Sequence, residues 1–241
     1  MANTFYDSGE QRAAKVNDLF TRIAPRYDLI NDLQSFGLHR YWKRRVVRMA
    51  GAAAGLRALD VCCGTGDLAF GLARSGTRSV GLDFGEQMLE RARDKIENQK
   101  SKPWFIRGDA QNIPSPDETF DIVTVGYGLR NLASWEAGLR EMLRVARPGG
   151  RVLVLDFGKP NNRLWRSIYF CYLRLFVPCL GRIFCGNAAA YAYILESLEH
   201  YPAQAGVAAK MQDLGMTNVR IINLLGGAMS INYGEKQAQK D

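Results

Sequence analysis

The sequence predicts an α/β protein built on a doubly wound parallel sheet, and three features near residue 60 carry this prediction. An apolar run at residues 57–62 has the length and composition of a buried strand. A glycine turn at residues 64–66 follows this run and is expected to open a helix. Twenty-three positions after Asp60, a second apolar run ends in Asp83. A carboxylate at that strand tip can accept hydrogen bonds from both hydroxyls of a ribose, so the unit is predicted to bind a nucleoside.

The glycine turn indicates which nucleoside cofactor to expect. Gly64 and Gly66 let the main chain turn sharply and pass close to a ligand, because neither residue has a side chain. The spacing Gly64-x-Gly66-x-x-Ala69 would also suit a dinucleotide. Asp67, however, would repel a pyrophosphate and attract a cation. S-adenosylmethionine carries a sulfonium and an amino group and fits that charge better, while a structural unit without a ligand is the alternative.

Composition places the chain among single-domain globular proteins with an anionic partner. The 241 residues are 47% hydrophobic and 23% charged, which is enough for one large core. The net charge of +8 favours contact with nucleic acid or with an acidic membrane face. Five cysteines show no metal-ligand spacing, so we expect buried reduced thiols and no metal site. The N-terminal residues lack a signal-peptide pattern, and a cytoplasmic protein is expected.

Residues 1–50 are predicted to form a helical cap before the nucleoside-binding unit. Apolar residues at helical spacing predict a helix within residues 11–27, ended by Pro25. A second helix is expected over residues 39–50 and leads into a linker at 51–55. The cap has more polar residues than a packing helix needs. Those that could face the ligand, unless they only cap helices, are Tyr27, Asp28, Asn31 and His39.

Strands and helices alternate through the rest of the chain, as a doubly wound sheet requires. Strands are expected at residues 79–83, 104–107, 121–127 and 151–156, and helices at 86–95, 134–145 and 203–215. Residues 147–150 (RPGG) are expected to form the turn before the last of these strands. Two closing strands at 219–225 and 229–233 flank Gly226 and Gly227, which signal a hairpin.

Residues at two strand ends extend the predicted cofactor site. Asp109 and Ala110 follow the strand at 104–107, where a carboxylate beside a small residue suits an adenine. Asp109 would otherwise cap the next short helix. Gly126 lies at the tip of the strand at 121–127 and would let a ligand lie close to the main chain.

Residues 161–199 form the most apolar segment, but they are not expected to span a membrane. On insertion scales each central arginine costs about 2.5–3.5 kcal/mol, and this segment holds Arg166, Arg174 and Arg182. Pro178 is expected to break the helix in the middle. Two interpretations remain: short helices packed as ordinary core, or a lid for a lipid-like substrate with arginines reaching anionic head groups. In the second, the protein would attach reversibly to the inner face of the cell membrane.

Two stretches resemble the signatures of the ubiquinone/menaquinone biosynthesis C-methyltransferase family. The first is residues 27–42, which depart from the family's usual residues at Ile30 and Gln34. Its matching positions are Tyr27, Asp28, Asn31, Ser35, His39 and Trp42. The second is residues 144–158, in which the departures are Arg147, Asp156 and Gly158.

Shorter motifs extend this similarity from about residue 12 to residue 235. Residues 128–131 (GLRN) and 193–197 (YILES) also match the family's pattern. The resemblance implies a class I methyltransferase with a seven-stranded sheet whose last strand is antiparallel. The methyltransferase domain would span residues 51–241, with the insertion at 161–199 as a substrate lid.

The resemblance also implies the reaction. The protein would transfer a methyl group from S-adenosylmethionine to a ring carbon of a polyprenylated quinol. Demethylmenaquinol is the first choice, and a benzoquinol precursor of ubiquinone or plastoquinone is the second. The residues expected to bind the cofactor, from the resemblance and the glycine turn together, are Asp60, Gly64, Thr65, Gly66, Asp83, Asp109, Ala110 and Gly126.

Aromatic carbon is a poor nucleophile until an adjacent phenol loses its proton. The substrate must therefore be the reduced quinol, and the site needs a base or a relayed water. Candidates for proton removal are His39, Tyr127 and Arg130. Since Arg130 stays protonated at neutral pH, we expect Arg130 and Asn131 to position the quinol oxygens while His39 or a water takes the proton. Alternatively, Arg130 pairs with a local carboxylate and holds its loop.

Other classes of protein fit the sequence less well. A methyltransferase that acts on adenine amino groups usually has an Asn/Asp-Pro-Pro-aromatic tetrad after the fourth strand. This chain has GYGL at residues 126–129, so no nucleic-acid partner is expected. A nicotinamide-dependent dehydrogenase is disfavoured by Asp67 and by the closing hairpin. A non-catalytic scaffold that binds S-adenosylmethionine stays compatible with the sequence, as does a homo-oligomer.

Overall fold

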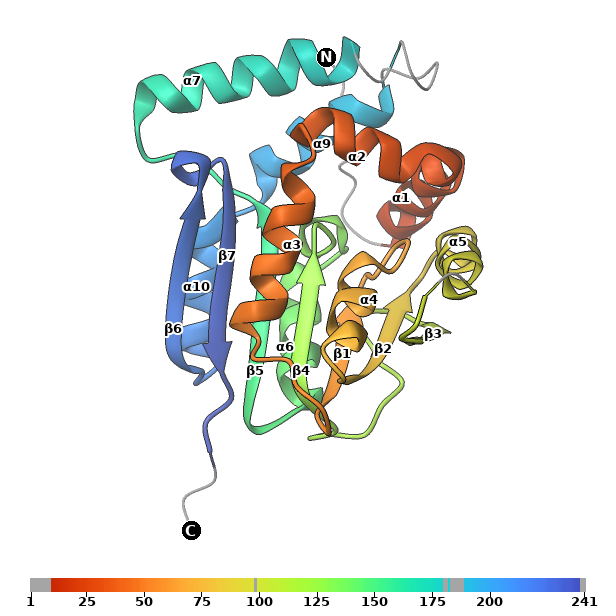
Figure 1. Cartoon of the computed structure of the whole chain (residues 1–241). Coiled ribbons are helices and arrows are strands. Elements are labelled where there is room, and N and C mark those ends of the chain that lie inside the picture. The colour runs from red at the N-terminus through yellow and green to blue at the C-terminus, as the bar shows by residue number, and fades with distance from the viewer. Residues whose placement is uncertain (1–9, 98, 180–181, 183–188, 239–241) are drawn as a thin grey trace.

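The computed structural model describes residues 10–97, 99–179, 182 and 189–238. These residues form a seven-stranded sheet with helices packed around it (Figure 1). The strands lie in the order β3-β2-β1-β4-β5-β7-β6. Their bounds are β1 (Arg57–Val61), β2 (Arg78–Asp83), β3 (Trp104–Arg107), β4 (Phe120–Gly126), β5 (Ala146–Phe157), β6 (Thr217–Leu224) and β7 (Met229–Glu235). The first five strands are parallel, and β7 runs antiparallel to both of its neighbours. The predicted doubly wound sheet with an antiparallel last strand is therefore confirmed.

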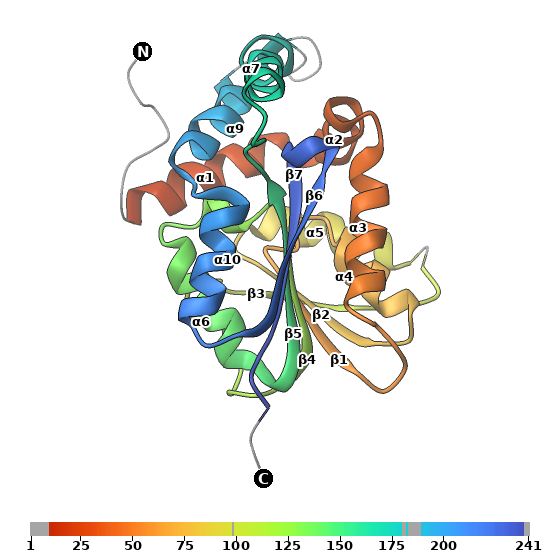
Figure 2. The ribbon, with the colours of Figure 1, turned by 90° about the vertical axis from the view of Figure 1, so that its left-hand side faces the viewer.

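Helices cover both faces of the sheet, and each face has its own apolar core. Figure 2 shows α6 (Trp135–Val145) and α10 (Ala203–Asp213) on one face, with α3 (Leu38–Met49) and α4 (Asp67–Arg74) on the other. The first face buries residues such as Met142 against the sheet. The second buries the α3 residues Trp42 and Val46 with α4 and the sheet. A parallel sheet requires this cover on both faces, because its strands are apolar on both sides.

One strand begins earlier than the sequence predicts. The expected turn at residues 147–150 lies inside β5, which begins at Ala146. Ala146 pairs with Phe120, and the register then shifts before Ile122 pairs with Arg151. The Pro-Gly-Gly sequence therefore forms a bulge in a long strand, and Gly149 has the positive φ of +75° that a glycine tolerates.

The N-terminal helices cover the carboxyl edge of the sheet and part of one face (Figure 1). They are α1 (Glu10–Ile23), a 3₁₀ turn (Ala24–Arg26), α2 (Tyr27–Ser35) and α3. Phe36 and Gly37 both have positive φ, and this left-handed turn redirects the chain from α2 into α3. As a result, α1 and α2 lie above the strand ends, whereas α3 runs along a face of the sheet (Figure 1). Residues 1–9 of the predicted cap lie outside the described residues.

The insertion forms the outermost layer above the same edge. It contains α7 (Arg163–Cys171), which continues as a π-helical turn (Tyr172–Phe176), and α9 (Ala189–His200). Helical residues reach Cys179, one residue past Pro178, and residues 180–181 that follow lie outside the described residues, so the predicted break at Pro178 stays a prediction. The π turn ends at Phe176, two residues before Pro178, and a proline ring in a regular α-helix would clash with the carbonyl four residues back. Within the described ranges, no helix is long and apolar enough to cross a membrane.

The four cysteines within the described residues are less buried than the sequence suggests, and Cys185 lies outside those residues. Cys171 and Cys179 are exposed on the helix of the insertion, and Cys62 and Cys63 are half-buried at the glycine turn. The prediction of buried thiols is therefore wrong for Cys171 and Cys179. It fails because the helix that holds them presents one apolar side to the outside of the molecule.

Candidate active site

A cavity of about 120 Å³ opens where β1, β2 and β4 end. Five of the residues predicted to bind the cofactor line it: Gly64, Asp83, Asp109, Ala110 and Gly126. Leu82 and Met88 add apolar walls. The cavity therefore combines a carboxylate with an apolar surface, which is what the ribose and the adenine of a nucleoside require.

Asp83 is fixed at the tip of β2 by the main chain. One carboxylate oxygen accepts a hydrogen bond from the Gly64 amide at 2.7 Å, and the other accepts one from the Gly85 amide at 2.9 Å. Burial raises the pKa of Asp83, and these hydrogen bonds act against that rise. Each oxygen keeps acceptor capacity, so the carboxylate can receive two further hydroxyl hydrogen bonds.

Asp60 supports the site from below and does not line the cavity. It is buried and accepts hydrogen bonds from the Thr124 hydroxyl at 2.8 Å and from the Ala69 amide at 3.2 Å. Burial raises the pKa of Asp60 to about 7. The carboxyl group thus ties β1 to β4 and to the first turn of α4, instead of facing a cofactor as expected.

Thr65 and Gly66 also have partners within the protein. The Thr65 hydroxyl donates to Asp28 of α2 at 2.7 Å. Gly66 has a φ of +86°, and a Cβ there would lie 2.7 Å from the ring of Phe105. The glycine is needed at this position because of the turn and the neighbouring strand β3, and the sequence pattern cannot distinguish that need from ligand approach.

Asp67 does not have the role that its charge suggested. Its carboxylate lies 2.7 Å from Lys43 and 3.5 Å from Lys95, and Lys95 also pairs with Asp28 at 2.6 Å. Burial favours the neutral acid, but the two lysines outweigh it and lower the pKa of Asp67 to about 2. The negative charge is balanced within the protein, so Asp67 gives no reason to prefer a cation over a pyrophosphate.

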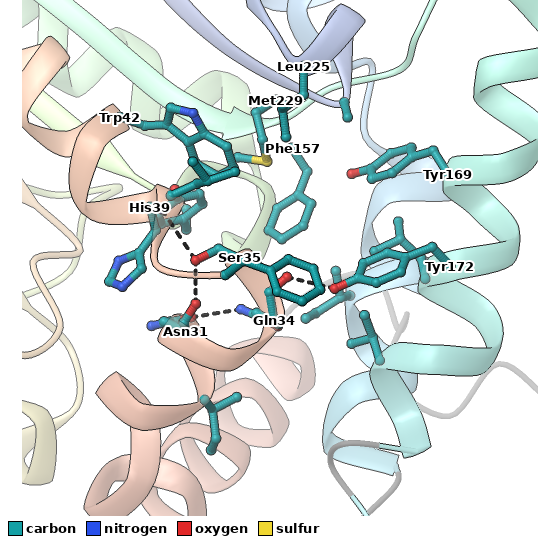
Figure 3. A pocket seen from close by; sticks show the side chains of 18 of the residues that line it. Asn31, Gln34, Ser35, His39, Trp42, Phe157, Tyr169, Tyr172, Leu225 and Met229 are labelled. Carbon is teal, nitrogen blue, oxygen red and sulfur yellow. Dashed lines mark hydrogen bonds between the residues drawn. The ribbon is translucent and has the colours of Figure 1, made fainter.

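A second cavity of about 300 Å³ lies next to the first and is mainly apolar. Residues from the cap, the insertion and the sheet line it, and Figure 3 shows cap residues on one side and Tyr169 and Tyr172 on the other. Phe20, Tyr27 and Tyr127 line both cavities. A ring held in the larger cavity would therefore lie beside a cofactor held in the smaller one.

His39 is the candidate base that the geometry supports. Its buried imidazole lies with Nε2 2.8 Å from Asp32, which also pairs with Arg40. Burial, together with the positive charge of Lys43, lowers the pKa of His39. A neutral imidazole that donates from Nε2 to Asp32 has Nδ1 as an acceptor, and Nδ1 is buried without a hydrogen-bond partner among the described residues. His39 lines the larger cavity, although Nδ1 itself is buried beneath the cavity wall.

Arg130 has the partner that the alternative interpretation proposed. Its guanidinium lies 2.6 Å from Asp156 and donates to the Tyr127 carbonyl at 2.6 Å. Both charged side chains are buried, and the guanidinium stacks over the Phe157 ring at 4.6 Å from its centroid. Arg130 lines the larger cavity, whereas Asn131 lines the smaller one and donates to the same Tyr127 carbonyl. These two residues therefore do not face one substrate position together.

Tyr127 lies between the two cavities and is a poor base. It has a φ of +64°, so the chain turns sharply at the end of β4 and directs the ring toward both cavities. Burial raises the pKa of its hydroxyl well above the ordinary value. The phenol stays protonated at neutral pH, and it can donate a hydrogen bond to a substrate oxygen.

Sequence reasoning missed several lining residues. Asn17 of α1 lines the cofactor cavity, and Tyr169 and Tyr172 of the insertion line the larger one. The Tyr172 hydroxyl donates to the Gln34 carbonyl of α2 at 2.7 Å and so joins the insertion to the cap. The spacing of the two tyrosines in an apolar helix is a signal for a shared face, but it does not reveal which cavity that face meets.

A parallel sheet with an antiparallel β7, and a cavity at its carboxyl edge that contains the Asp83 carboxylate, is the arrangement of the S-adenosylmethionine-dependent methyltransferases. The structure of an S-adenosylmethionine-dependent methyltransferase from Aquifex aeolicus superposes on this chain with a TM-score of 0.60 at 19% identity. The superposition covers 86% of this chain and 97% of that one. Phosphoethanolamine N-methyltransferase 2 from Haemonchus contortus, solved with S-adenosylhomocysteine, superposes on this chain with a TM-score of 0.62 at 14% identity. The superposition covers 83% of this chain and 53% of that one.

The chain belongs to the ubiE/COQ5 methyltransferase family, whose model matches residues 7–236. Demethylmenaquinone methyltransferase from Desulfitobacterium hafniense is 41% identical over 234 residues, which cover 95% of this chain and 92% of the relative. The ubiquinone/menaquinone biosynthesis C-methyltransferase UbiE from Ectopseudomonas mendocina is 40% identical over 231 residues, covering 94% and 90%. The predicted family is confirmed, and the chain is a methyltransferase.

Proposed function

We propose that this methyltransferase converts demethylmenaquinol to menaquinol, with the methyl group supplied by S-adenosylmethionine. The observation that carries the proposal is the wall of Phe20, Tyr27 and Tyr127 shared by the two cavities. It sets an apolar, aromatic cavity directly beside the smaller one that contains the Asp83 carboxylate. The names of the relatives point to the same class of substrate.

The residues of the smaller cavity fit S-adenosylmethionine. Asp83 offers acceptors for two ribose hydroxyls, while Leu82, Met88 and Ala110 offer an apolar surface for the adenine. Gly126 also lines this cavity, and packing requires a glycine there, since a Cβ at this position would lie 2.8 Å from Leu68. When bound, this cofactor supplies an electrophilic methyl group.

The protein's own task is to hold the quinol and to move its proton. His39 takes the proton of the phenol next to the reacting carbon through a relayed water, since Nδ1 is buried behind the cavity wall, and Asp32 stabilises the imidazolium that forms. The hydroxyls of Tyr127 and Tyr169 are buried without partners among the described residues and can donate to the quinol oxygens. Arg130 does not act as a base. Its charge is balanced by Asp156, and this pair, with the hydrogen bond to the Tyr127 carbonyl, fixes the loop that carries Tyr127.

Orientation contributes to the rate as well. The cap and the insertion lie on opposite sides of the cavity and meet where the Tyr172 hydroxyl donates to the Gln34 carbonyl, so a ring in the cavity would be enclosed by both (Figure 3). Fixing two reactants in register is worth up to about 7–11 kcal/mol in favourable systems. The apolar walls also exclude water from the reacting centre.

A competition between two quinols tests this proposal. The protein is incubated with methyl-labelled S-adenosylmethionine and an equal mixture of reduced demethylmenaquinol and a reduced prenylated benzoquinol. We expect label mainly in menaquinol. Label mainly in the benzoquinol product would assign the second substrate, and label in neither would overturn quinol methylation.

A further inference from the structure

The helix of the insertion has apolar residues on two opposite sides. Its inner row, which consists of Tyr169, Leu173 and Val177, is buried in the core. Its outer row is exposed: Leu164, Ile168 and Leu175 have 72%, 51% and 66% of their surface accessible. Apolar side chains in such a row normally have a partner, because exposed apolar area is unfavourable in water. Both ribbon views place this helix at the outside of the molecule (Figures 1 and 2).

The exposed row continues into the rim of the larger cavity. Five residues line that cavity and are also exposed: Phe36, Leu38, Trp165, Ile168 and Leu225. Phe36 is 75% accessible and lies at the turn between α2 and α3. The rim is therefore built from the cap, the insertion and the β6–β7 connection. The mouth of the cavity and the outer row form one apolar surface.

Positive charge accompanies this surface. Residues 161–179 contain Arg163, Arg166 and Arg174 and no aspartate or glutamate. Arg163 and Arg174 are exposed, and Glu199 lies 4.0 Å from Arg174, also exposed. Apolar side chains flanked by arginines fit the interface of a bilayer with anionic lipids, where the chains enter the acyl region and the arginines meet head groups.

We propose that this surface docks on an anionic lipid bilayer, with the mouth of the larger cavity against the membrane. The docking surface follows from exposed residues alone. Its role in substrate delivery rests on the proposed function: the quinol ring would enter the cavity while the polyprenyl tail stays in the lipid. A second copy of the chain fits this surface less well. In a dimer the arginines of the two copies would face each other, and the second copy would cover the mouth of the larger cavity.

The test uses the full chain with two kinds of vesicle, phosphatidylcholine alone and phosphatidylcholine mixed with phosphatidylglycerol. Cosedimentation is expected to be at least about tenfold stronger with the mixed vesicles. The variant Leu164→Ser/Leu175→Ser changes outer-row residues that do not line either cavity. We expect its binding to mixed vesicles to fall at least about tenfold. Its methylation of a short-tailed quinol in water should stay at the wild-type rate.

Trp104→Ser is the matched control, because Trp104 is 77% accessible at the start of the edge strand β3. It should bind vesicles like the wild type, and circular dichroism should show both variants folded. The proposal is overturned if the double variant keeps its vesicle binding, or if it only converts a dimer to a monomer in sedimentation. If the wild type binds vesicles through this surface but methylates no quinol, the docking surface stands and the proposed function fails.

Discussion

His39 and Asp32 form a hydrogen-bonded pair that depends on one turn of the main chain. The residues lie on α2 and α3, and the left-handed turn at Phe36 and Gly37 brings them to 2.8 Å. The sequence indicates His39 as a candidate base because of its place in the signature. It does not reveal the partner, since the angle between the two helices decides which side chains meet.

We expect His39→Gln to lower kcat by about 10²–10⁴ while cofactor affinity stays unchanged. Glutamine can still donate to Asp32, but it cannot accept a proton at neutral pH. Because the pKa of His39 is lowered, the wild-type imidazole is neutral at pH 7 and is lost as a base only when the pH falls below its usual value of 6.5. The kcat–pH profile should show this acid limb, and the variant should lack it. A variant with the wild-type kcat and acid limb would remove His39 from the mechanism.

Arg130→Ala should destabilise the protein by about 3–5 kcal/mol, because Asp156 would be left buried without its charged partner. It should also slow methyl transfer with little change in cofactor affinity. Denaturant unfolding measures the first effect. Arg174→Ala is the control: this arginine is exposed 4.0 Å from Glu199, and its loss should cost less than about 1 kcal/mol. Equal stabilities for the two variants would mean that the buried pair does not hold the loop.

At the scale of elements, the glycine turn serves packing as much as ligand binding. The sequence correctly predicts a strand, a turn, a helix and a second strand that ends in Asp83. It cannot show that Asp60 bonds to Thr124, that Thr65 bonds to Asp28 or that Gly66 packs against Phe105, because these partners belong to other elements. A motif gives the order of the residues, and tertiary packing decides which of them face the cavity.

Gly66→Ala is expected to destabilise the fold by about 2–4 kcal/mol. The new Cβ would lie 2.7 Å from the Phe105 ring, and the residue would keep a φ of +86°. Gly55→Ala has a similar φ of +87° but no atom within 4 Å, so it should cost only about 1 kcal/mol. Thermal or denaturant unfolding compares the two. Similar losses would show that backbone strain alone requires glycine at position 66.

Asp60 gives the sheet a pH-dependent stability. Its pKa is raised to about 7 in the folded protein, so its contribution is present below the unfolded value of 3.8 and is lost as the pH rises through 7. The shift corresponds to up to about 4 kcal/mol. We therefore expect Asp60→Asn to gain stability relative to the wild type as the pH increases from about 4 to about 8. The measurement is the free energy of unfolding of both proteins at each pH. A constant difference between the variant and the wild type over this range would show that the carboxyl group is not neutral in the folded protein.

At the scale of the whole molecule, the N-terminal cap and the insertion after β5 create the larger cavity above the sheet. Alternating strands and helices make the sheet predictable, because periodicity and glycine turns are local signals. The seating of the insertion over α2 is not local: it depends on contacts such as the one from Tyr172 to Gln34, 138 residues apart. The sequence thus predicted the cofactor half of the site better than the substrate half.

The central claim is that the two cavities bring a phenolate ring and a methyl donor together for transfer to carbon. The most direct measurement uses S-adenosylmethionine with a deuterated methyl group and locates the label in the product by nuclear magnetic resonance. We predict an intact labelled methyl on a ring carbon, formed from reduced demethylmenaquinol and not from the oxidised quinone. A labelled methyl ether on a quinol oxygen, or no labelled quinol although the cofactor binds, would contradict the account.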